Sequence, residues 1–65
     1  MTGEIVRVDD KKGFGFIRGA DGAERFFHVS ALVGIALDEI RPPMPVTFEP
    51  TQTPKGLRAE TVRPA

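Results

Sequence analysis

The segment whose side chains offer the clearest chemistry is Lys12–Arg18 (KGFGFIR), in which a single glycine separates two phenylalanines. In a β-strand, alternate residues share a face, so Phe14, Phe16 and Arg18 lie on one side and Ile17 on the other. If Ile17 faces a core, the two rings point outward. Exposed rings beside basic side chains suit the stacking of unpaired nucleic-acid bases, because every base has a π-face.

A second aromatic segment, Arg25–Val29 (RFFHV), follows after a short turn. Alternation places Phe26 and His28 on one face and Phe27 and Val29 on the other, which we expect to be buried. The outward rings of the two segments would then be cross-strand neighbours. We name this predicted patch the aromatic platform; its members are Phe14, Phe16, Phe26 and His28. Exposed apolar patches of this kind mark binding sites.

Each of these residues also has a simpler interpretation. Phe14 and Phe16 could pack in a core, although a barrel of 65 residues has little room for them. His28 could be a surface histidine that only makes hydrogen bonds. A metal site at His28 is not expected, since the chain has no cysteine and no second histidine.

Short apolar stretches separated by glycines and prolines predict an all-β protein. The strands expected are Gly3–Val8, Phe14–Arg18, Glu24–Val29, Val46–Glu49 and Gly56–Val62. Asp21-Gly22 is typical of a hairpin turn, and residues 50–55 are expected to form a loop. Ser30 is a candidate cap for one helical turn over residues 31–33.

The segment from residue 33 to residue 45 is apolar but interrupted by prolines. Its spacing of Leu32, Ile35 and Ile40 allows a short helix, which the prolines at 42, 43 and 45 would end. We expect the loop to cover an open end of the barrel. An interface for self-association or for a partner is the alternative.

Composition limits the classes of function. Lys and Arg together number 9, as do Asp and Glu, so the formal net charge is zero. Binding driven mainly by phosphate neutralisation requires a basic surface, so stacking must contribute more of the affinity here.

With one histidine and no cysteine, no nucleophile–base pair is evident, and we expect no enzyme activity and no cofactor. Neither a signal peptide nor an apolar run of about 20 residues is present, so we expect a cytoplasmic protein that does not bind membranes.

The two aromatic segments resemble the paired ribonucleoprotein motifs of bacterial cold-shock proteins. Lys12–Ile17 is similar to the first motif, and Arg25–Val29 followed by Ser30-Ala31-Leu32 is similar to the second. The similarity extends to Gly3, Asp21-Gly22, Val46-Thr47-Phe48 and Lys55-Gly56, and so covers residues 1–65 as one cold-shock-like domain. RNA-recognition-motif domains share the first motif, but they need two long helices and more residues.

The resemblance implies a five-stranded antiparallel OB-like β-barrel that binds single-stranded RNA or DNA with little sequence preference. It implies action as an RNA chaperone or as a regulator of transcription or translation. It also implies that the aromatic platform stacks bases and that Lys12 lies near phosphate.

The chain departs from the family pattern at several stacking positions. Where the family has Trp-Phe-Asn, this sequence has Arg7-Val8-Asp9, and Val29 and Leu37 also replace usual aromatics. The Arg7 guanidinium can still stack on a base, whereas Asp9 beside Asp10 would repel a backbone. Since each stacked base is worth about 1–3 kcal/mol, we expect weaker binding or a shorter site than in a member with all the aromatics.

The complete set of candidate nucleic-acid contacts is Arg7, Lys12, Phe14, Phe16, Arg18, Phe26, His28 and Lys55. Individually, Arg18, Arg25, Lys55 and Arg58 have the alternative of being solvated barrel charges. The alternative function is a protein-interaction module that has lost part of its platform and docks on a protein, such as a component of the transcription machinery. A weak homodimer is the other partner considered.

Overall fold

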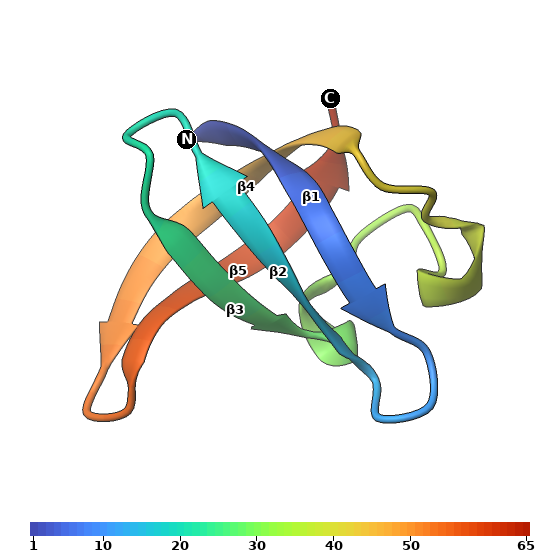
Figure 1. The fold of residues 1–65 in the computed structure, drawn as a ribbon, viewed down its shortest axis with the longest axis horizontal. Coiled ribbons are helices and arrows are strands. Elements are labelled where there is room, and N and C mark those ends of the chain that lie inside the picture. Colours follow the sequence, from blue (N-terminus) through green and yellow to red (C-terminus); the bar gives the residue numbers. More distant parts are fainter.

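Five β-strands form a closed barrel in the computed structural model, which describes residues 1–65 (Figure 1). The strands are β1 (Thr2–Asp9), β2 (Phe14–Gly19), β3 (Glu24–His28), β4 (Met44–Thr53) and β5 (Gly56–Pro64). Two single turns of 3₁₀ helix, η1 (Val29–Ala31) and η2 (Leu37–Glu39), lie between β3 and β4. The prediction of an all-β, five-stranded barrel is confirmed.

The strands follow the order β1-β2-β3-β5-β4 around the barrel, and β1 closes the ring by pairing with β4. Four of these pairings are antiparallel. The contact between β3 and β5 is parallel and places Phe26 opposite Arg58. In Figure 1, strands β1 to β3 run across the longer β4–β5 hairpin, and the segment between β3 and β4 lies at one end of the barrel.

The core consists of inward side chains from all five strands together with the segment between β3 and β4. Its ten members are Ile5, Ile17, Phe27, Ala31, Leu37, Ile40, Val46, Phe48, Ala59 and Val62. Ile17 and Phe27 are fully buried, as the alternation along β2 and β3 predicts. Leu37 and Ile40 pack into the core, so the apolar loop does cover an end of the barrel.

Gly15 shows why the rings of β2 point outward. A side chain on Gly15 would place its Cβ 2.6 Å from Cζ of Phe27 and 2.8 Å from the carbonyl oxygen of Arg7. The Phe27 ring therefore occupies the inner side of β2 at this position. With the inner side filled by a ring from β3, the neighbouring rings of β2 are left on the outer face.

The end of β3 differs from the prediction. Val29 was expected inside, but the strand ends at His28, and Val29 is 38% exposed because it begins η1. The cap of this turn is His28 rather than Ser30: Nδ1 of His28 accepts the backbone N–H of Ser30 at 3.1 Å. Between residues 32 and 40, only Leu37–Glu39 forms a helical turn.

The prediction of a loop over residues 50–55 is also wrong, because β4 continues to Thr53 and pairs with β5 as far as Gly56. β1 pairs with β4 only over Met44–Thr47. Pro50 therefore lies where β4 has a neighbour on one side alone, and its missing N–H can face the open edge of the sheet. A proline at such an edge does not end a strand.

Arg25 is not the solvated charge that the sequence allowed. Its residue is 6% exposed, with the guanidinium carbon 5.6 Å from the ring centre of Phe48. Two hydrogen bonds join it to Asp21, from Nη1 to Oδ1 at 3.1 Å and from Nη2 to Oδ2 at 2.7 Å. These bonds, with the backbone N–H of Ala23, lower the pKa of Asp21 to about 2.

Candidate nucleic-acid interface

The registers of β1, β2, β3 and β5 arrange the outer face of the barrel into three rows of cross-strand neighbours. The Phe14 row is Asp9, Phe14 and His28; the Phe16 row is Arg7, Phe16, Phe26 and Arg58; the Arg18 row is Glu4, Arg18 and Glu24. The predicted aromatic platform occupies the first two rows. The outward rings of the two sequence segments are therefore cross-strand neighbours.

The three phenyl rings of the platform contact one another. The ring centres of Phe14 and Phe26 are 5.5 Å apart, those of Phe14 and Phe16 5.9 Å, and those of Phe16 and Phe26 6.1 Å. These separations are favourable for aromatic pairs, and the two pairs that include Phe16 are edge-to-face. All three residues are only half-buried and none belongs to the core, so core packing does not account for them.

A guanidinium group lies at each end of the Phe16 row. The carbon atom Cζ of Arg7 is 4.4 Å from the ring centre of Phe16, and Cζ of Arg58 is 5.3 Å from that of Phe26. Both distances are within the range of a cation–π contact. Arg58 also has Nε 3.4 Å from Oε1 of Glu60. The platform is therefore flanked by two planar cations.

Arg58 was not among the predicted contacts. Its position beside Phe26 results from the parallel contact between β3 and β5, which joins strands distant in the sequence. Alternation along β5 alone would have placed Arg58 and Glu60 on one face. It could not have shown that this face borders the platform.

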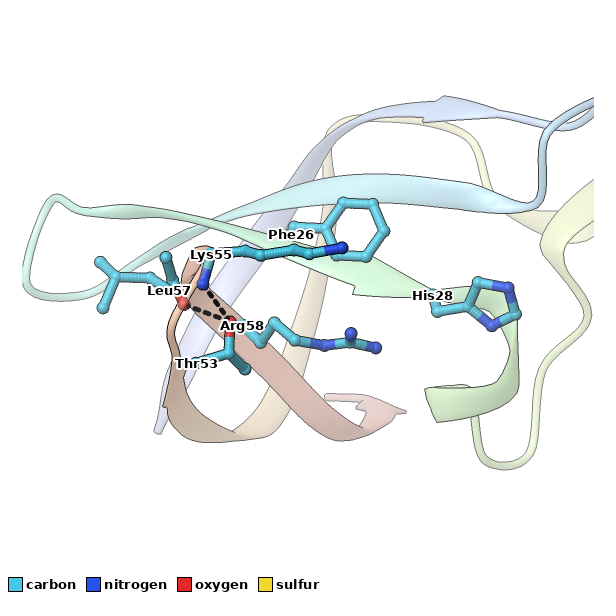
Figure 2. Close-up of a pocket in the computed structure, with 7 residues that line it drawn as sticks. Phe26, His28, Thr53, Lys55, Leu57 and Arg58 are labelled. Atoms are coloured by element: carbon cyan, nitrogen blue, oxygen red, sulfur yellow. Dashed lines mark hydrogen bonds between the residues drawn. The ribbon is translucent and has the colours of Figure 1, made fainter.

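A groove of about 450 Å³ lies between β3 and the β4–β5 turn. Its lining includes Phe26, His28, Lys55 and Arg58 (Figure 2). Figure 2 shows the side chains of Lys55 and Arg58 extending from the hairpin toward Phe26 and His28. Thr53 fixes the turn: its hydroxyl donates to the carbonyl of Gly56 at 3.0 Å and accepts the N–H of Lys55 at 3.2 Å.

His28 lies at the rim of this groove with one nitrogen already in use. Nδ1 accepts the backbone N–H of Ser30 and lies 2.8 Å from its hydroxyl oxygen. An accepting Nδ1 places the proton of the neutral ring on Nε2. His28 is exposed, so Nε2 can donate to a ligand.

A second groove, of about 330 Å³, lies on the β1 side of the platform and is lined by Arg7, Val8, Asp9, Phe14, Gly15 and Phe16. Lys12 lies nearby in the β1–β2 turn, where it is exposed and its backbone N–H donates to Oδ1 of Asp9 at 3.0 Å. The platform thus has a groove on each side, and each groove has cations at its border.

Arg18 is a predicted contact that lies outside the two platform rows and lines neither groove. It lies between Glu4 and Glu24 in the third row, with Nη2 3.4 Å from Oε2 of Glu24. Two carboxylates beside one guanidinium make this row acidic. We infer that it limits the platform rather than extending it.

The description "'Cold-shock' DNA-binding domain" belongs to the family model that matches residues 1–65. The chain belongs to the cold-shock domain family. This family consists of nucleic-acid-binding domains rather than enzymes, in agreement with the prediction that the chain is not an enzyme.

Several bacterial members of the cold-shock domain family are similar along nearly their whole length. The Cold shock-like protein CspA of Stigmatella aurantiaca is 41% identical over 63 residues, covering 95% of this chain and 93% of the relative. Cold shock protein 2 of Lactiplantibacillus plantarum is 38% identical, covering 97% and 96%. Cold shock protein CapB of Pseudomonas syringae is 34% identical, covering 97% and 91%.

Two further properties of this cold-shock domain concern other classes of site. No group of three or more His, Cys, Asp or Glu side chains is placed to hold a metal ion. The structure also has no helix of the length and apolar character needed to cross a membrane. The cytoplasmic location stays a prediction.

Proposed function

We propose that this cold-shock domain binds single-stranded RNA or DNA by stacking bases on the aromatic platform. Phe14, Phe16 and Phe26 each offer a ring to a base, and His28 adds a donor at Nε2. Lys12 and Lys55 are proposed to meet phosphates, and Arg7 and Arg58 to meet phosphates or to stack through their planar guanidinium groups. Arg18 is less suited to contact phosphate, because two glutamates flank it.

The observation that supports this proposal most directly is the contiguous cluster of three half-exposed rings outside the core. Leaving three phenyl groups in partial contact with water costs hydrophobic stabilisation in a domain this small, which has little to spare. Base stacking recovers that surface. Duplex nucleic acid cannot use it, because the bases of a duplex are already stacked on each other.

The adjacent residues Phe26 and Phe27 provide a matched test. Phe26→Ala should reduce the affinity for a labelled single strand by about 1–3 kcal/mol while the protein stays folded. Phe27→Ala should destabilise the fold by about 3–5 kcal/mol, because Phe27 is fully buried. Fluorescence anisotropy gives the affinity, and thermal unfolding by circular dichroism gives the stability.

Val33→Ala is the control, since Val33 is an exposed apolar residue away from the platform. Its affinity should equal that of the unmodified protein. Unfolding by Phe26→Ala would show that the ring serves the fold. Unchanged affinity in the folded variant would show that the ring does not contact the ligand.

Holding unpaired strands would give the domain the action of an RNA chaperone. Added in excess to an RNA hairpin with a fluorophore and quencher at its ends, the protein should shift the equilibrium toward the open form. Failure to bind any oligonucleotide would favour the alternative function, a protein-interaction module.

A further inference from the structure

The groove between β1 and β2 combines a cation and an anion beside phenyl rings. Arg7 and Asp9 are alternate residues of β1 and share its outer face, with Arg7 opposite Phe16 and Asp9 opposite Phe14. Both line the same groove of about 330 Å³. Neither side chain belongs to any ion pair of the structure. The two charged groups are therefore available to a ligand.

The Arg7 guanidinium lies over the Phe16 ring, with its Cζ atom 4.4 Å from the ring centre. The arginine side-chain hydrogen bonds of the structure involve Arg18, Arg25 and Arg41 and not Arg7, so the five N–H donors of Arg7 are free. A guanidinium presents these donors in a rigid fork, and less conformational freedom is lost for each hydrogen bond that it forms.

The Asp9 carboxylate is also held in place. Its Oδ1 atom accepts the backbone N–H groups of Lys11 at 3.1 Å and Lys12 at 3.0 Å. Its Oδ2 atom has no partner in the protein, so it can accept from a ligand. A carboxylate repels phosphate, so this side of the groove suits the edge of a base and not the sugar–phosphate backbone.

Among the common bases, guanine matches this pair of groups best. Its O6 and N7 atoms accept the two donors of an arginine fork. Its Watson–Crick edge, which is accessible in a single strand, has two adjacent donors, N1–H and the N2 amine. Adenine, cytosine, thymine and uracil lack this combination of two adjacent acceptors and two adjacent donors.

We propose that Arg7, Asp9 and the Phe14 ring form a pocket that selects guanine within a bound single strand. The pocket extends the proposed function: the platform supplies stacking for any base, and the groove on its β1 side adds preference for one. In place of the large aromatic that the family has at position 7, this chain uses a hydrogen-bonding pair.

The first test compares two labelled strands of about seven nucleotides, one all thymine and one with a single central guanine. A single guanine prevents the strands from forming four-stranded structures. The guanine strand should bind about tenfold more tightly, the discrimination expected of one bidentate contact. Equal or weaker binding of the guanine strand would overturn the proposal.

The second test changes single atoms of the base. Inosine lacks the N2 amine and 7-deazaguanine lacks the N7 acceptor, and each should reduce affinity several-fold. In Asp9→Asn, whose amide oxygen can still accept the N–H groups of Lys11 and Lys12, inosine should bind as well as guanine, while the 7-deazaguanine loss remains. In Arg7→Lys, 7-deazaguanine should bind as well as guanine, while the loss with inosine remains. Uniform weakening of all strands by both variants would reject a base-specific role.

Free guanosine monophosphate distinguishes a strand from a nucleotide as the source of the base. It should bind at least tenfold more weakly than the guanine strand, because it lacks the other stacked bases; tighter binding would overturn the assignment to strands.

Failure of the proposed function has a separate outcome. If both strands bind equally and Phe14→Ala weakens both, only the guanine pocket is rejected; if neither binds, both proposals are rejected.

Discussion

Phe26 and Phe27 are adjacent in the chain but lie in opposite environments, since Phe26 is half-buried on the outer face and Phe27 is fully buried. The alternation of a strand is sufficient to predict this contrast. It is not sufficient for Val29, because the alternation rule fails where a strand ends, and the hydrogen bond between His28 and Ser30 ends β3 one residue earlier.

Arg25 is a second residue whose position the sequence did not predict. Charged side chains are seldom buried unless they are paired. The partner of Arg25 is Asp21, and the two side chains meet because of the conformation of the hairpin turn, which the sequence alone does not specify. The buried guanidinium thus depends on one carboxylate four residues earlier, which makes the stability of the fold sensitive to acid.

Because the pKa of Asp21 is lowered from 3.8 to about 2 in the folded protein, protonation favours the unfolded state. The contribution of this carboxylate to stability should be complete above about pH 4 and should disappear as the pH falls toward about 2. Asp21→Asn should lower the urea midpoint at neutral pH, and the difference from the unmodified protein should shrink over that range. A difference that stays constant down to pH 2 would contradict the linkage.

At the scale of elements, the β4–β5 hairpin is where the structure adds most to the sequence. The sequence predicted a loop over residues 50–55, yet β4 continues to Thr53 because it pairs with β5. Pro50 is tolerated because the other edge of β4 has no neighbour there. This extension supports the turn that places Lys55 beside the platform. The parallel contact of β5 with β3 then places Arg58 over Phe26. A pairing between strands so far apart in the sequence has no local signal.

Arg58→Ala should weaken binding of a single strand by about 1 kcal/mol, the scale of a cation–π contact between a guanidinium and a bound base, equivalent to about fivefold. Arg63→Ala is the matched control, since Arg63 is an exposed arginine of the same strand outside both grooves. Isothermal titration calorimetry with one oligonucleotide would compare the two. Equal losses would show that Arg58 acts only through net charge.

For the whole molecule, charge distribution matters more than total charge. The net charge is zero, but cations flank the platform while Glu4 and Glu24 flank Arg18 in the third row. The barrel, its strand number and the identity of the platform were predictable, because they depend on alternation and on recognisable motifs. The flanking pattern was not predictable, because it depends on which strands become neighbours.

The salt dependence of binding should therefore be shallow. A single strand releases about 0.7 counterions for each phosphate neutralised. Three cations line the grooves, Arg7, Lys55 and Arg58, and a fourth, Lys12, lies in the adjacent β1–β2 turn. The slope of log affinity against log salt should be no steeper than about −3. A steeper slope, measured by anisotropy from low to high potassium chloride, would show that charge and not stacking dominates.

The most direct test of the central claim is an amide NMR titration with a single strand of about seven thymines, with the matching duplex as control. The chain has no tryptophan or tyrosine, so intrinsic fluorescence cannot report binding. We predict saturable shifts centred on Phe14, Phe16, Phe26 and His28, and none of comparable size with the duplex. A well-dispersed spectrum that does not change at millimolar protein, or shifts that avoid these residues, would contradict base stacking on the platform.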